Sequence, residues 1–171
     1  GDSINSLKYK FVSDTLYISP TGYPLIEHPL YPDLELANLL RSANTIVYHK
    51  SSEKIERYGP AWAWDDFKQS FSPERSSFPI YGNVIMITKL ENGELRIKPN
   101  IFNINLDSTS SQSYTRKENK NDFTINPLKI KLNDTILIPY IVSDENTIRL
   151  LKNLTMKEVI SESNDIINSD N

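Results

Sequence analysis

The spacing of apolar residues changes from every second residue to helical spacing and back within the N-terminal third, which constrains the fold more than any other feature. Apolar and polar residues alternate over Leu7–Val12 and again over Thr15–Ile18, which predicts a β-hairpin. Pro32 and Asp33 then begin a run with helical spacing that reaches about Arg41. The β-branched run Thr45–Tyr48 predicts a buried strand, so this part is expected to form a small α/β unit.

The middle of the chain has the alternation that is typical of strands. Two such runs, Asn83–Thr88 and Leu95–Pro99, flank Asn92-Gly93, a dipeptide typical of tight hairpins whose two central residues take φ > 0. The Ser-, Asn- and Lys-rich stretch 107–121 predicts a loop or the tip of a hairpin. Further strands are expected at Ile101–Leu106, Asp122–Ile125 and Thr135–Ile138.

The C-terminal part returns to helical spacing. Ser143 is expected to cap a helix that ends near Leu154, and a second short helix is expected over Met156–Ile160. Residues 161–171 are polar and are expected to form a tail. The patterns predict an α+β fold. Residues 1–76 and 140–160 would form a small α/β lobe, and residues 77–139 an antiparallel β lobe inserted within it.

The charge balance argues against nucleic acid as a partner. The formal net charge is −3, and the basic residues Arg116, Lys117 and Lys120 alternate with acidic ones instead of forming a basic surface. The chain has no cysteine, which excludes disulfides, thiol nucleophiles and cysteine-ligated zinc. No run approaches the ~18 apolar residues that a membrane helix requires, so no transmembrane segment is expected.

Few residues have a spacing that is typical of catalysis or of metal binding. The two histidines, His28 and His49, do not form an H-E-x-x-H pattern, so both are expected to be surface or loop residues and no metal is expected. None of the five glycines has the spacing of a phosphate-binding loop, and no G-x-S-x-G occurs. The chain is therefore expected to bind no cofactor.

The segment from Tyr58 to Phe67 concentrates aromatic side chains. If it is extended, Trp62 and Trp64 project to the same side and form a stacking platform for a sugar or a peptide. The alternative, which we favour, is that these rings anchor an irregular segment to the core. Asp65 and Asp66 have the residue types of a glycosidase acid/base pair, but neighbours in sequence point apart, and a carboxylate here also suits a helix cap. These four residues are the candidate binding site, and no catalytic residue is expected.

The same segment, Gly59-Pro60-Ala61-Trp62-Ala63-Trp64-Asp65-Asp66, resembles the G-x-x-W-x-W-D-D signature of class C low-molecular-mass penicillin-binding proteins, the serine D-Ala-D-Ala carboxypeptidases and endopeptidases. Phe78–Val84 resembles the stretch that follows it, and Pro20–Leu25 resembles the family's G-D-P-x-L turn, with Tyr23 in place of Asp. Ile138–Ile141 is similar to the end of the same region. The Asn- and Lys-rich composition resembles Bacteroidetes members.

The resemblance implies a non-catalytic part of such an enzyme. The family's catalytic motifs are an S-x-x-K helix, an S-x-N loop and a K-T-G strand, and the matched region lies between the first and the second. The chain is therefore expected to contain neither an S-x-x-K motif nor a K-T-G motif. Ser169-Asp170-Asn171 spells S-D-N, but it lies in the polar tail and is interpreted as a coincidence.

The partner implied by the resemblance is the catalytic domain of the same parent chain, together with a peptidoglycan peptide or glycan. The implied location is the periplasm, with an export signal upstream of this chain. Two alternatives remain open from the residues. One is a free-standing peptidoglycan- or carbohydrate-binding module that uses the tryptophans, and the other is an independent hydrolase that uses Asp65 or Asp66.

Overall fold

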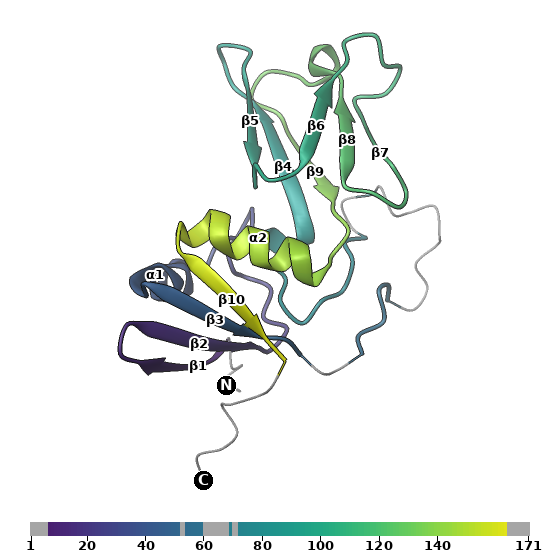
Figure 1. The fold of residues 1–171 in the computed structure, drawn as a ribbon. Helices are drawn as coiled ribbons and strands as arrows, with labels where there is room; N and C mark the ends of the chain where they lie inside the picture. The colour runs from purple at the N-terminus through teal and green to yellow at the C-terminus, as the bar shows by residue number, and fades with distance from the viewer. Residues whose placement is uncertain (1–6, 52–53, 60–68, 70–71, 164–171) are drawn as a thin grey trace, which may run out of the picture. The chain divides into compact units, whose positions relative to one another are not determined.

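The computed structural model describes residues 7–51, 54–59, 69 and 72–163. These residues divide into two compact units. The first comprises the described parts of Gly1–Arg57, Arg75–Gly82 and Val142–Asn171, and the second comprises those of Tyr58–Glu74 and Asn83–Ile141. Helices and sheets are both present, and antiparallel strand pairs predominate, so the predicted α+β class is confirmed (Figure 1). None of the helices in the described part of the chain is long and apolar enough to cross a membrane.

The first unit contains a four-stranded sheet in the order β1-β2-β3-β10. The predicted hairpin is confirmed: Ser13 and Asp14 connect β1 (Leu7–Val12) to β2 (Thr15–Pro20), and Val12 pairs with Thr15. The chain then crosses over to β3 (Thr45–His49), which is parallel to β2.

The last strand, β10 (Glu158–Glu162), is parallel to β3. The expected short helix over Met156–Ile160 is therefore wrong, and Ser161 and Glu162 belong to a strand rather than to the polar tail. The physical reason is that Met156 takes the left-handed conformation (φ 57°), which ends the preceding helix, and pairing with β3 then buries Val159.

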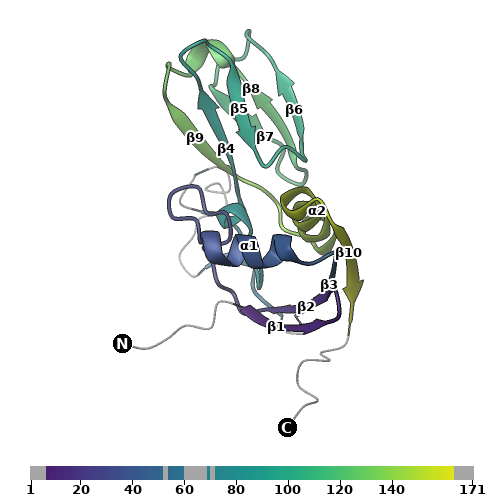
Figure 2. The same cartoon turned by 90° about the vertical axis from the view of Figure 1, so that its left-hand side faces the viewer.

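Two helices cover one face of this sheet (Figures 1 and 2). Asp33 caps α1 (Leu34–Ser42), because its Oδ1 accepts a hydrogen bond from Leu36 N at 3.0 Å. Ser143 caps α2 (Asp144–Thr155) in the same way through Asn146 N. Both caps confirm the helix starts expected from the sequence. The apolar faces of the helices and of the sheet form one core, whose buried residues include Leu16, Ile18, Leu36, Leu40, Ile46, Leu150, Leu151 and Val159.

The second unit contains two three-stranded sheets. In the first, β4 (Val84–Lys89) lies between β5 (Leu95–Lys98) and β9 (Thr135–Pro139), and both pairings are antiparallel. The β4–β5 hairpin forms as predicted, but its turn differs, because Gly93 takes a positive φ (85°) and Asn92 does not. Gly93 N donates to Leu90 O, which is typical of a three-residue loop that ends in a left-handed glycine.

The second sheet has the order β6-β8-β7. The expected strands β6 (Asn103–Leu106) and β8 (Asp122–Ile125) are present, and they pair in parallel, unlike the antiparallel pairs elsewhere in this unit. The stretch expected to be a loop or the tip of a hairpin contains a further strand, β7 (Tyr114–Arg116), antiparallel to β8, so residues 117–121 connect the two strands of a hairpin. The core of the second unit consists of apolar side chains from both sheets and their connections, with Val84, Ile85, Ile87, Phe123, Ile125, Ile130, Ile138 and Tyr140 buried.

Candidate functional site

The four candidate binding residues, Trp62, Trp64, Asp65 and Asp66, lie outside the described residues. Their binding role and the preference for a core anchor over a stacking platform therefore remain predictions. The described residues on either side of this segment fix where the chain leaves and returns. Arg75 N donates a hydrogen bond to Arg57 O at 2.8 Å, so the two residues of the first unit that flank the tryptophan segment lie next to each other.

In the second unit, the Asn83 side chain forms hydrogen bonds with Glu74 and Tyr140. Its side-chain amide donates from Nδ2 to Glu74 O at 2.8 Å and accepts at Oδ1 from the Tyr140 hydroxyl at 3.2 Å. The backbone adds a hydrogen bond from Tyr140 N to Asn83 O at 3.0 Å. Asn83 is 2% exposed, and an amide supplies a donor and an acceptor from one side chain, which few residues of this size can do. Asn83, which directly precedes β4, therefore connects Glu74 with Tyr140, which directly follows β9.

The turn before β4 has a strained backbone. Tyr81, Gly82 and Asn83 all take left-handed φ angles, of 56°, 61° and 58°. This conformation is costly for a residue with a bulky side chain such as Tyr81. The turn is held by the hydrogen bond from Tyr81 N to Ile26 O at 2.9 Å and by the parallel bridge between Ile26 and Ile80. Strain of this kind is often found at functional sites, and it identifies the turn as a feature that the sequence pattern alone does not reveal.

The His28 side chain lies against Gly82 of this turn, and it also binds the backbone of Leu30 and Tyr31 in the loop that follows His28. A Cβ added to Gly82 would lie 2.9 Å from His28 Cδ2. Nδ1 of His28 accepts hydrogen bonds from Leu30 N and Tyr31 N, at 3.2 and 3.3 Å, and the ring stacks on Tyr31. In the neutral ring the proton therefore lies on Nε2. This agrees with the interpretation of His28 as a loop residue.

His49 differs from its sequence-based interpretation. It is the last residue of β3, is 1% exposed and stacks on Tyr17 with ring centroids 5.9 Å apart. The expectation of a surface or loop position is wrong here, because parallel pairing with β10 extends the strand to this residue. Within the described part of the chain neither ring nitrogen has a hydrogen-bond partner.

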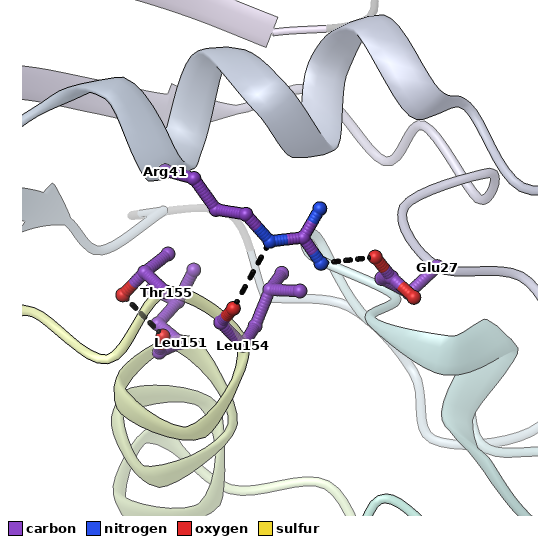
Figure 3. A network of polar contacts seen from close by, with 5 residues as sticks. All are labelled: Glu27, Arg41, Leu151, Leu154 and Thr155. Carbon is purple, nitrogen blue, oxygen red and sulfur yellow. Dashed lines mark hydrogen bonds and ion pairs between the residues drawn. The ribbon is translucent and has the colours of Figure 1, made fainter.

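The loop before α1 and the two helices are connected by Arg41 (Figure 3). Its Nη2 pairs with Glu27 Oε1 at 2.5 Å, and its Nε donates to Leu154 O at 3.3 Å, which satisfies a carbonyl in the last turn of α2. Burial, and then the charge of Glu27, raise the pKa of Tyr81, while Arg41 opposes the shift. The charges of Glu27 and Arg41 thus act on Tyr81 of the strained turn, and these contacts contain no nucleophile beside a base.

Tyr23, which stands where the resembled family has Asp, supports the first helix. Its hydroxyl donates to Asp33 Oδ2 at 3.0 Å, while the other carboxylate oxygen caps α1. Partial burial, followed by the hydrogen bond and the charge of Asp33, raises the pKa of Tyr23. Within the described residues no cluster of three or more His, Cys, Asp or Glu side chains has the arrangement of a metal site.

The expectation that the chain contains no S-x-x-K motif is wrong by letters, because Ser51 and Lys54 have this spacing. Both residues lie outside helices and strands. A serine and a lysine three positions apart come close to each other when they lie on one turn of a helix, and that condition is not met at these two residues. The sequence contains no K-T-G. Ser169-Asp170-Asn171 lies outside the described residues.

No known family profile matches the sequence, and no curated protein does. Among solved structures, the chain is similar to penicillin binding protein 4 (dacB) from Haemophilus influenzae, with a TM-score of 0.54 and 15% sequence identity. The similarity covers 93% of this chain and 43% of that protein, so the chain spans less than half of its length. At this identity the likeness concerns the fold, and the chain is therefore folded like a part of a penicillin-binding protein.

Proposed function

We propose that this chain is a non-catalytic accessory region of a periplasmic D-Ala-D-Ala carboxypeptidase or endopeptidase that acts in peptidoglycan remodelling. The observation that carries the proposal is the fold likeness, which covers 93% of the chain and 43% of a protein named for binding penicillin. The G-x-x-W-x-W-D-D segment supports it independently, because its resemblance to the same enzymes comes from sequence alone.

The same observations support a non-catalytic part. Acyl transfer by a serine needs a base within hydrogen-bond reach of the hydroxyl. Ser51 and Lys54, which match the first motif by letters, lie outside helices, and no K-T-G strand accompanies them. The region inserted between the first and second motifs of the resembled enzymes is the part that would lack this chemistry. In that position the chain would contact the catalytic domain of its own parent and, through Trp62 and Trp64, a peptidoglycan peptide or glycan.

The first test is covalent labelling of the isolated chain by a fluorescent penicillin, followed by denaturing electrophoresis and intact mass measurement. We expect no stoichiometric adduct, because Ser51 and Lys54 do not lie on a helix, the arrangement that would place the lysine as a base beside the serine hydroxyl. The Ser51→Ala variant is the matched control. An adduct on the wild-type chain that is lost in Ser51→Ala would show that Ser51 is a nucleophile and would contradict the proposal.

The second test is the coding sequence on either side of this chain. The proposal expects an S-x-x-K motif before residue 1 and S-x-N and K-T-G motifs after residue 171. A reading frame that contains only this chain would instead favour a free-standing binding module. Titration with muropeptides followed by tryptophan fluorescence then tests ligand binding, with Trp62→Ala and Trp64→Ala as variants.

A further inference from the structure

Strand β1 has an unusual surface for an outer strand. Within the described residues it pairs only with β2, so its other edge is open. Three of its large apolar side chains are exposed: Tyr9 by 51%, Phe11 by 41% and Val12 by 49%. Outer strands with exposed apolar side chains are templates for pairing with a further strand, and most proteins avoid them. This surface therefore calls for an explanation.

Two rows of side chains that cross the sheet end at β1. Directly paired residues point to the same face, so Phe11 continues the row of Leu16 and Ile46, both of which are fully buried. Tyr9 likewise continues the row of Ile18 and Tyr48. Their rings stand edge to face, with centroids 6.4 Å apart. In both rows the side chains on β2 and β3 are therefore buried, whereas those on β1 are about half exposed. One more strand beside β1 would continue both rows.

The opposite face of β1 is positively charged. Lys8 and Lys10 alternate with the aromatic residues and pair with Ser19 and Tyr17 of β2. Both lysines are exposed, and β1 contains no acidic residue. A neighbouring strand in register would therefore place one set of its side chains on two aromatic rings and the alternate set beside two positive charges. Opposite charges at directly paired positions stabilise a sheet, and like charges destabilise it.

The pairing of β1 with β2 also indicates which backbone groups face the open edge. Leu7 pairs with Pro20, which has no N–H to donate, and this favours a pair that exchanges no hydrogen bonds. Such pairs alternate along an antiparallel ladder, so Tyr9 and Phe11 belong to the same class. The N–H and C=O groups of Tyr9 and Phe11 then point away from β2, and they are the groups that an added strand would bind.

We propose that β1 is a docking strand for an extended peptide segment in which apolar and acidic residues alternate. The peptide adds a strand to the sheet, its apolar side chains pack on Tyr9 and Phe11, and its carboxylates lie beside Lys8 and Lys10. The charges disfavour a second copy of this chain as the occupant. In the two longest antiparallel registers that keep the aromatic rings of both copies on one face, Lys10 meets Lys10 or Lys8 of the other copy. This inference does not depend on the proposed function.

The test uses the whole chain and a fluorescein-labelled peptide that has the length of β1 (6 residues) and alternates valine with glutamate. Binding is measured by fluorescence anisotropy. We expect saturable binding, and about tenfold weaker binding to the variant Lys8→Glu/Lys10→Glu, which replaces two attractive pairs by two repulsive ones. That variant should instead prefer a peptide that alternates valine with lysine. The control Lys129→Glu/Lys131→Glu makes the same charge change at two exposed lysines outside β1 and should bind like the wild type.

A second comparison uses only the wild-type chain and therefore does not depend on how the variants fold. Methylation of the peptide's backbone nitrogens at alternate positions, on the edge that faces β1, should abolish binding. A peptide of the same composition in which all valines precede all glutamates should bind weakly. Strand addition is wrong if the methylated peptide binds as well as the unmodified one, or if the wild-type chain binds neither peptide. Charge recognition is wrong if both lysine-pair variants lose binding equally. Sedimentation showing a dimer that dissociates in Lys8→Glu/Lys10→Glu would identify a second copy as the occupant and overturn the proposal.

Discussion

The hydroxyl of Tyr23 donates a hydrogen bond to Asp33 Oδ2 at 3.0 Å, while Asp33 Oδ1 caps helix α1 through Leu36 N at 3.0 Å. The carboxylate of Asp33 thus connects the Tyr23 side chain to the first turn of α1. A side chain of this length at position 23 reaches Asp33 across ten residues of sequence. Its hydrogen bond holds the carboxylate in the orientation that the cap requires.

Loss of this hydrogen bond is expected to cost about 1 kcal/mol in Tyr23→Phe, a change that leaves the cap itself in place. Asp33→Ala removes the cap and the partner of Tyr23 together, and it should cost about 2 kcal/mol. Urea unfolding of the two single variants and the double variant measures the coupling. If the two effects are additive, the hydrogen bond does not contribute to stability.

His49→Phe is expected to stabilise the protein by about 1 kcal/mol. The imidazole of His49 is 1% exposed, and neither nitrogen has a partner among the described residues, so its polar atoms have lost hydration without compensation. Phenylalanine keeps the stacking on Tyr17. His28→Phe is the matched control and should destabilise, because Nδ1 of His28 accepts two backbone hydrogen bonds. Thermal unfolding of both variants measures the difference, and a destabilised His49→Phe would show that the imidazole is satisfied in solution.

Gly82→Ala is expected to be much more destabilising than Gly93→Ala. Both glycines have positive φ, so alanine costs roughly 1 kcal/mol at either position. At Gly82 the new Cβ also meets His28 Cδ2 at 2.9 Å, whereas Gly93 has open space around it. The clash should raise the cost at Gly82 to about 3 kcal/mol. Chemical denaturation checks the ranking, and His28→Ala added to Gly82→Ala should be less than additive.

Stability is expected to fall steeply above pH 10. Burial, and then the charge of Asp144, raise the pKa of Tyr48 to about 12, against a hydrogen bond from Ser77 that lowers it. A pKa that is raised on folding contributes stability below the unfolded value of 10, and this contribution is lost as the pH rises toward 12. The loss is roughly 2–3 kcal/mol. Unfolding measured between pH 8 and 11 should show a shallower decline for Tyr48→Phe, and identical pH profiles would exclude Tyr48 as the cause.

Periodicity predicted most of the elements, because their burial follows the sequence pattern directly. The β1–β2 hairpin, both capped helices and the β4–β5 hairpin lie where apolar spacing places them. β10 could not be found in this way, since Val159 is one of few apolar residues there and the strand depends on pairing with β3. β7 has the polar composition of a loop, and Arg116 is nevertheless 4% exposed within it. Long-range pairing overrides local composition at both strands.

The site was only partly predictable. The sequence singled out the tryptophan segment by its aromatic density. It indicated Asn83 only as the last residue of the stretch before β4. Its burial, its left-handed backbone and its contacts with Glu74 and Tyr140 depend on segments far apart in the sequence. An asparagine that directly follows a glycine and precedes a strand is the one local signal for such a turn. His49 gave no local signal, because its burial results from the pairing of β3 with β10.

The hydrogen bond from Tyr140 N to Asn83 O, at 3.0 Å, has a consequence for how such a chain can change in evolution. The longer segment of the second unit, Asn83–Ile141, begins and ends at neighbouring backbone positions, so a linker of a few residues could replace the chain between Asn83 and Tyr140. Closing such a short loop costs little chain entropy, and insertion of a domain is tolerated where its termini are adjacent. The stretch between residues 83 and 140 can therefore lengthen, shorten or be exchanged between proteins while the sheet and helices of the first unit keep their own pairing.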